Sequence, residues 1–254
     1  MYMQLFSKNI ILLLCLTYSV PGWSGEVLVA VAANFSAPIQ RITAAFEKDT
    51  GNKVNISIGS TGKFYTQIKN GAPYQILLAA DNETPEKLEK EGFAQVGSKF
   101  TYAVGKLVLW SKQPGFVDEK GDVLKSGNFM HISVADPKLA PYGLAAVQTL
   151  AKLGIDHQIT SKVVWGENIG QTFLFVDSKS AELGFVALSQ VYADGHIKEG
   201  SAWVVPESMH TPIKQDAVLL SQGVKNPVAL TFFSYLKSPR VKEIIKSYGY
   251  ELSN

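Results

Sequence analysis

The sequence has a single cysteine, Cys15, which lies inside a short apolar run near the N-terminus. A lipoprotein signal would need a small residue before this cysteine, and Leu14 stands there instead. Without the N-terminal run, the chain has no cysteine and therefore no disulfide or thiol chemistry. Histidine is also scarce, and the four histidines show no metal-ligand spacing: His131, His157, His196 and His210.

Charge is sparse as well. Charged residues make up 18% of the sequence, and the formal net charge is +2. A nucleic-acid surface would need clustered lysine and arginine, so we expect no nucleic-acid partner. The hydrophobic fraction of 46% is that of an ordinary globular protein, which can bury an ample core without disulfides.

The first 24 residues differ from the rest of the chain. Lys8 precedes an apolar run at 10–20, and the small residues Gly22 and Ser24 follow it. This run is shorter than the roughly 20 residues that span a bilayer. The pattern is typical of a secretory signal peptide cleaved after Ser24, with an uncleaved anchor as the alternative. We therefore expect the chain after 1–24 to be an exported protein.

Through the rest of the chain, apolar and β-branched runs alternate with segments whose apolar residues recur at helical spacing. The predicted strands are 27–32, 54–58, 76–80, 107–110, 132–135, 163–165, 183–187 and 203–205. The predicted helices are 36–49, 63–70, 85–91, 144–153, 171–179, 227–236 and 240–248. This alternation indicates an α/β fold, with mostly parallel sheets covered by helices.

The middle of the chain has a strand–helix alternation of its own. We interpret it as a second α/β lobe, joined to the first by two crossings near 103–106 and 204–206. A single doubly wound domain is the alternative. The predicted division assigns the signal peptide to 1–24, lobe I to 25–104 with 205–254, and lobe II to 105–204.

Four strand-to-helix junctions, two in each half, carry small and polar residues: 32–36, 59–63, 136–143 and 166–171. Ligands bind outside the carboxyl ends of strands in open α/β sheets, and helix N-termini bind anions through free N–H groups. Taken singly, Asn34, Ser36 or Ser60 is an ordinary helix-cap residue, and Tyr142 an ordinary packing residue. Together, the four donor-rich junctions predict an anion site.

The residues at these junctions do not match known enzyme motifs. The segment 59–64 lacks the spacing of a phosphate-binding loop, and Phe64 follows its lysine. A hydrolase with Thr61 or Ser60 as nucleophile would need a base in reach, and no histidine lies in or beside these loops. Asp81 fits a cap or turn better than a catalytic role. We therefore expect a binding protein and no enzyme.

Several motifs occur in order along the chain: VAVAANF at 29–35, IGSTGKF at 58–64, NGAPY at 70–74, AAD at 79–81, DPKLAPYG at 136–143, LKSP at 236–239 and YGY at 248–250. Through them the chain closely resembles the periplasmic molybdate-binding proteins, the receptors of ABC importers for molybdate and tungstate. The resemblance runs through essentially the whole chain after 1–24. It implies a two-lobed clamshell of the type II periplasmic-binding-protein class, with the oxyanion held between the lobes.

The resemblance also implies the ligand residues. Carried over by position, they are Asn34, Thr61, Tyr142 and Ile169, with Ala33 and Ser60 as neighbouring donors. Ile169 would act through its backbone N–H. At one position, Ala187, the chain departs from several members of the family, which have a tyrosine ligand there. The implied protein is a monomeric periplasmic receptor without a cofactor, which delivers its ligand to a membrane ABC permease.

Physical chemistry agrees with such a site. A tetrahedral dianion only accepts hydrogen bonds, so neutral donors suffice and no residue needs to coordinate the metal directly. Lys63 is expected to point to solvent. A receptor for sulfate or another tetrahedral oxyanion is the alternative ligand assignment.

Overall fold

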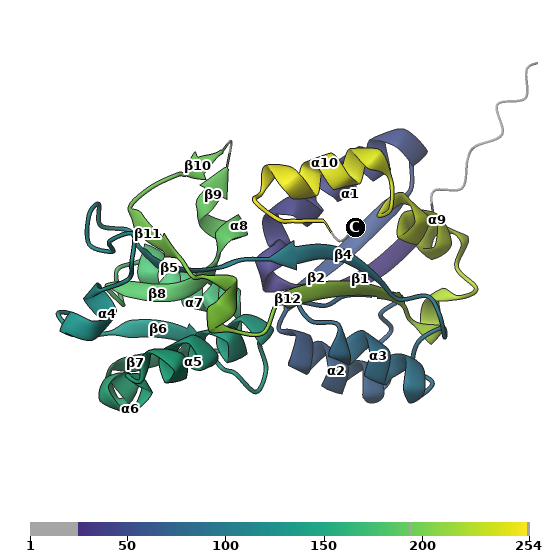
Figure 1. Cartoon of the computed structure of the whole chain (residues 1–254). Coiled ribbons are helices and arrows are strands. Elements are labelled where there is room, and N and C mark those ends of the chain that lie inside the picture. The colour runs from purple at the N-terminus through teal and green to yellow at the C-terminus, as the bar shows by residue number, and fades with distance from the viewer. Residues whose placement is uncertain (1–24, 194, 253–254) are drawn as a thin grey trace, which may run out of the picture.

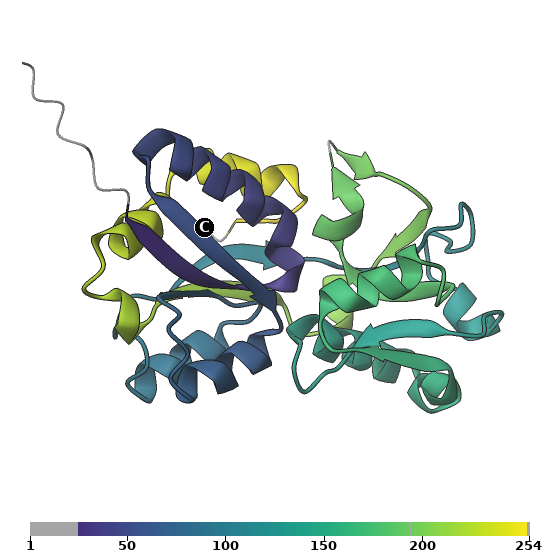
Figure 2. The same cartoon turned by 180° about the vertical axis from the view of Figure 1, so that it is seen from behind.

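The computed structural model describes residues 25–193 and 195–252, so the predicted signal peptide 1–24 lies outside the described residues. The chain forms two lobes that lie side by side, each around a five-stranded sheet (Figures 1 and 2). In the described part of the chain, no helix is both long and apolar enough to cross a membrane.

Lobe I contains the N-terminal strands and the C-terminal helices. Its strands are β1 (Glu26–Ala32), β2 (Lys53–Gly59), β3 (Ile76–Leu78), β4 (Phe100–Gly105) and β12 (Ile213–Leu219). Its helices are η1 (Ala33–Phe35), α1 (Ser36–Thr50), α2 (Thr61–Lys69), α3 (Glu83–Lys90), η4 (Ser221–Gly223), α9 (Pro227–Tyr235) and α10 (Pro239–Ser247). The sheet order is β2-β1-β3-β12-β4, with β12 antiparallel to both of its neighbours.

Lobe II contains the middle of the chain. Its sheet strands are β5 (Leu107–Ser111), β6 (Ile132–Ala135), β7 (Val163–Gly166), β8 (Leu183–Ala187) and β11 (Ser201–Val204), and a small ribbon pairs β9 (Tyr192–Ala193) with β10 (His196–Ile197). Its helices are α4 (Val123–Ser126), α5 (Pro141–Leu153), α6 (Asp156–Ile159), η2 (Thr160–Lys162), α7 (Ile169–Asp177), α8 (Leu188–Val191) and η3 (Glu207–Met209). The sheet order is β7-β6-β8-β5-β11, with β5 antiparallel to both neighbours.

The two sheets follow one plan. Each has three parallel strands, then an antiparallel strand, then an edge strand. The antiparallel strands, β12 and β5, are the first strands after the two crossings between the lobes. The prediction of an α/β fold with two mostly parallel sheets flanked by helices is confirmed.

Helices cover both faces of each sheet (Figure 1), because the central parallel strands β1, β3, β6 and β8 are largely apolar and buried. In lobe I, α1, α9 and α10 pack on one face, and α2 and α3 pack on the other. Helix α1 shows the pattern: Ile39, Ile42 and Phe46 are fully buried, and Gly51 ends the helix with a φ of 74°.

The sequence prediction missed strands β4, β9, β10 and β12, and it placed the starts of four helices two or three residues too late. Strand β12 was missed because it carries the polar run Lys214, Gln215 and Asp216 inside an otherwise apolar segment. Helices α2, α3, α5 and α7 each begin two or three residues earlier than predicted. Residues that the sequence placed in junction loops therefore belong to first helical turns.

Candidate functional site

The carboxyl ends of the parallel strands of both sheets meet between the lobes. There they enclose a small cavity of about 10 Å³. Lobe I lines it with Ala32, Ala33, Asn34, Gly59, Ser60, Thr61 and Ala80, and lobe II with Ala140, Pro141, Tyr142, Asn168 and Ile169. All six residues proposed from the sequence thus line one cavity. None of these lining residues, all in the described part of the chain, is charged.

Two hydroxyl groups of lobe I face this region from the start of α2. The backbone N–H of Ala80 donates to Thr61 Oγ1 at 2.9 Å, which leaves the hydroxyl hydrogen of Thr61 outside that bond. Ser60 is the residue before the helix, yet its side chain does not cap it. Its Oγ is buried without a hydrogen-bond partner among the described residues. A buried hydroxyl without a partner is costly, so this geometry fits a ligand that accepts a hydrogen bond.

Asn34 is held by bonds inside the protein. Its Nδ2 donates to Gln215 Oε1 at 2.8 Å and to the Tyr250 hydroxyl at 2.9 Å. Both amide hydrogens are therefore engaged, and Oδ1 is buried without a partner within the described chain. The backbone N–H of Asn34, in the short helix η1, is the donor that this residue can offer to the cavity.

The carbonyl of Asn34 is fixed as well. Ser189 Oγ, from lobe II, donates to Asn34 O at 2.8 Å, and the Tyr250 hydroxyl donates to the same oxygen at 2.9 Å. Ser189, Gln215 and Tyr250 were not assigned a role from the sequence. Tyr250 belongs to the motif at 248–250, but nothing in the sequence indicates that it reaches a residue more than 200 positions away.

Lobe II contributes two helix starts. Pro141 occupies the first turn of α5, where its missing N–H costs nothing, and Tyr142 follows it. Ile169 is the first residue of α7, and Asn168 caps this helix by accepting from the Gln171 N–H at 3.0 Å. The first N–H groups of a helix have no acceptor within it and attract anions. Both helix starts therefore offer backbone donors to the cavity.

The tyrosines around the cavity stay neutral. Burial raises the pKa of Tyr250 to about 12, and burial raises the pKa of Tyr102 and of Tyr142 well above the usual value for tyrosine. A raised pKa favours the protonated hydroxyl. These side chains therefore add no negative charge to the site at physiological pH.

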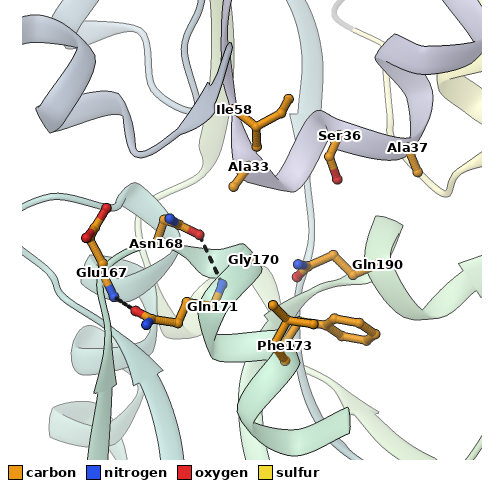
Figure 3. A pocket seen from close by; sticks show the side chains of 11 residues that line it. Ala33, Ser36, Ala37, Ile58, Glu167, Asn168, Gly170, Gln171, Phe173 and Gln190 are labelled. Carbon is orange, nitrogen blue, oxygen red and sulfur yellow. Dashed lines mark hydrogen bonds between the residues drawn. The ribbon is translucent and has the colours of Figure 1, made fainter. Parts of the chain in front are cut away.

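A wider groove of about 670 Å³ opens between the lobes next to the cavity (Figure 3). Ile58, Ala33 and Ser36 lie on its lobe I side, opposite Asn168 and Phe173 from lobe II.

Besides the Ser189–Asn34 bond, further polar contacts join the lobes near the cavity. The Gly62 N–H donates to Leu139 O at 3.0 Å. Lys63 Nζ lies 2.6 Å from Glu167 Oε2, and both side chains are about half exposed. Lys63 does not line the cavity and is partly exposed, so the expectation that it points to solvent holds only in part: its ammonium group pairs with the carboxylate of the opposite lobe.

Two other predicted positions have structural roles. Asp81 accepts hydrogen bonds from Thr84, at 2.8 Å from the N–H and 3.1 Å from the hydroxyl, which confirms the turn role. Ala187 is fully buried in the core of lobe II, and its N–H donates to Gln190 Oε1 at 2.9 Å. Ala187 does not line the cavity. In the described residues, no cluster of histidine, cysteine and carboxylate side chains could hold a metal ion.

Comparison with known proteins defines the class. The model of the bacterial extracellular solute-binding protein family matches residues 27–251, and the chain belongs to this family. It is 59% identical to the molybdate-binding protein ModA of Azotobacter vinelandii, over 90% of this chain and 91% of the relative. It is 47% identical to the molybdate-binding protein ModA of Rhodobacter capsulatus, over 94% and 93% of the two chains.

A solved structure agrees with these relatives. The Azotobacter vinelandii periplasmic molybdate-binding protein superposes with a TM-score of 0.87 at 43% identity, covering 90% of this chain and all of the other. The resemblance stated from the sequence motifs, and the two-lobed fold that it implied, are confirmed.

Proposed function

We propose that this protein is an exported receptor that captures molybdate or tungstate between its lobes and delivers it to a membrane ABC permease. The observation that carries the proposal is the uncharged cavity, which is lined from both lobes and faced by unpaired hydroxyl and backbone donors. Such a cavity suits a tetrahedral dianion, which only accepts hydrogen bonds. The names of the similar receptors from Azotobacter and Rhodobacter support molybdate as the ligand.

The proposed ligand residues are Asn34, Thr61, Tyr142 and Ile169, with Ala33 and Ser60 as further donors. A hydrogen bond to a charged group contributes about 1.5–3 kcal/mol. Four to seven such bonds, after the costs of ordering and lobe closure, support binding of about 8–12 kcal/mol, which is micromolar to nanomolar affinity. No cofactor and no direct metal ligand is needed for this binding.

Two other readings are weaker. A smaller oxyanion such as sulfate would not reach the donors of both lobes at once, so sulfate is a weaker candidate ligand than molybdate or tungstate. A hydrolase would need a base beside Thr61 or Ser60, and the described residues that line the cavity include no histidine and no carboxylate. Binding without chemistry is the function that this donor set supports.

We further propose that cleavage after Ser24 releases a monomeric periplasmic protein. Lobe I (25–104 with 205–254) and lobe II (105–204) would then move as units about the two crossings. The hydrogen bonds between the lobes support a ligand-stabilised closed state, because a ligand that contacts both lobes favours closure. Small-angle scattering would show compaction when molybdate is added, and no compaction would contradict this movement.

Calorimetry tests the function itself. The protein is purified from the periplasm of cells that express the full chain, and is titrated with molybdate, tungstate, sulfate and phosphate. We expect tight binding of the first two and much weaker binding of the others, because a smaller or protonated ion satisfies fewer donors. Sulfate binding as tight as molybdate binding would overturn the ligand assignment.

A further inference from the structure

Gln215 lies directly behind the cavity without lining it. It belongs to β12, the first strand after the second crossing, and its side chain is fully buried. The pairing of β12 with β4 is irregular here: Gln215 pairs with Ala103 and Asp216 with Thr101, so Tyr102 is left over as the extra residue of a bulge. Bulges next to functional sites often re-aim a side chain, which makes this position worth following.

The amide of Gln215 joins two proposed ligand residues from opposite lobes. Its Oε1 accepts from Asn34 Nδ2, of lobe I, at 2.8 Å, and its Nε2 donates to the hydroxyl of Tyr142, of lobe II, at 3.0 Å. A third bond comes from the bulge residue: the Tyr102 hydroxyl donates to Gln215 Oε1 at 3.1 Å. Asn34, Gln215 and Tyr142 are thus one hydrogen-bonded unit that spans the lobes.

The first crossing between the lobes passes close to the Gln215 and Tyr142 side chains, at Gly105. A Cβ at Gly105, the last residue of β4, would lie 2.0 Å from the Tyr142 hydroxyl and 2.5 Å from Gln215 Nε2. Any side chain at this position would therefore collide with the Gln215–Tyr142 bond. The Gln215–Tyr142 bond therefore lies directly against the first crossing between the lobes.

We propose that Gln215 is a positioning residue for the anion site, an inference that rests on the proposed function. It does not touch the anion. It fixes the Asn34 side chain, which anchors the η1 turn, and it fixes the Tyr142 side chain at the start of α5. Without it, the donors of the two lobes lose their mutual alignment, and the anion binds less tightly.

A double-mutant cycle with molybdate tests the proposal. Gln215→Met keeps the length of the side chain and removes its hydrogen bonds. We expect it to weaken molybdate binding about tenfold in the wild-type background, the size of one lost hydrogen bond. In a Tyr142→Phe background the same substitution should weaken binding only about twofold, because the partner hydroxyl is already gone.

Two controls separate positioning from general damage. In a Thr61→Ala background, Gln215→Met should keep its tenfold effect, since the bond of Thr61 goes to Ala80 and shares no partner with Gln215. Tyr102→Phe removes a bond to Gln215 that stays within lobe I, and should change affinity by about twofold at most. Thermal unfolding checks that each variant is folded; Gln215→Asn, too short to reach both partners, replaces Gln215→Met if the latter does not fold.

The outcomes are distinct. Wild-type affinity in the folded Gln215 variants would overturn the inference. So would an equal effect of Gln215→Met in the wild-type and Tyr142→Phe backgrounds, because that would mean a role independent of the bridge between the lobes. A wild-type protein that binds no molybdate would overturn the proposed function, and the inference with it.

Discussion

The two lobes share a strand plan but contribute different chemistry to the cavity. Lobe I presents the hydroxyl groups of Ser60 and Thr61 and a turn at Asn34, whose side-chain amide is held by the hydrogen bonds that it donates to Gln215 and Tyr250. Lobe II presents the starts of α5 and α7, whose lining side chains are mostly apolar and whose donors are backbone N–H groups. Side-chain substitutions should therefore change ligand affinity mainly in lobe I, and stability mainly in lobe II.

Two glycines in first helical turns show this contrast. A Cβ at Gly143, in α5, would lie 2.1 Å from Ala135 O, inside its own lobe. A Cβ at Gly62, in α2, would lie 3.1 Å from Leu139 Cα and 3.2 Å from Leu139 O, across the cleft. One position is limited by packing within a lobe, and the other by how closely the two lobes approach.

The largest effect is expected for Gly143→Ala. The new Cβ overlaps backbone atoms that cannot rotate away, so the start of α5 must shift against β6. We expect the free energy of unfolding to fall by about 3 kcal/mol, in the upper range for overpacking. Urea denaturation measures this loss. Leu144→Ala, at the exposed neighbouring position, is the control, and an equal loss in the two variants would contradict the packing argument.

The next effect is on affinity, at Thr61. Thr61→Ala removes a buried hydroxyl from the cavity and should weaken molybdate binding by about 1–3 kcal/mol, or roughly 5- to 150-fold. Thr66→Ala, which removes a hydroxyl from the exposed side of the same helix, is the matched control. Calorimetry compares the two.

Ile169→Ala is the corresponding substitution in lobe II. Because Ile169 is expected to bind the anion through its backbone N–H, shortening its side chain should change molybdate affinity little. It should instead lower the free energy of unfolding by leaving a cavity. If Thr61→Ala binds molybdate like the wild type while Ile169→Ala does not, the contrast between the lobes is wrong.

These residues also show what the sequence could predict. The junctions were found because strand ends, glycines and donor residues follow one another along the chain, and each junction is local. The helix starts at Thr61 and Ile169 were placed two residues late, and the start of α5 three residues late, although Pro141 was an available signal for α5. Boundaries of this kind depend on tertiary contacts such as the Ala80–Thr61 bond.

What escaped the sequence lies far from the junctions in chain order. Gln215 and Tyr250 reach Asn34 across separations of 181 and 216 residues. A buried glutamine in a strand looks like a polar interruption, which is why β12 was not predicted. Only the fold shows that this glutamine is hydrogen-bonded to Asn34 and Tyr142.

A smaller effect is expected for Gly62→Ala. The methyl group is tight against Leu139 in the closed molecule, so the lobes must separate slightly, and the Gly62 to Leu139 hydrogen bond weakens. We expect molybdate binding to weaken by about threefold, part of the value of one hydrogen bond, without a loss of stability in the ligand-free protein. Paired titration and thermal unfolding check this. A fall in the unfolding temperature without a change in affinity would place the strain inside lobe I instead.

The smallest effect concerns the ion pair between Lys63 and Glu167. Both side chains are about half exposed, so the pair contributes little and is screened by salt. If it holds the lobes together, Lys63→Met and Glu167→Gln should each weaken molybdate binding by about two- to fivefold at low salt, and the difference should vanish near 0.5 M salt. If Lys63 instead acts by attracting the anion, the two substitutions must change molybdate affinity in opposite directions. Lys63→Met would then weaken binding, whereas Glu167→Gln would strengthen it by removing a repulsive charge. Titrations of both variants at two salt concentrations decide between these roles, and tighter binding by Glu167→Gln would exclude the contact between lobes as the reason for the pair.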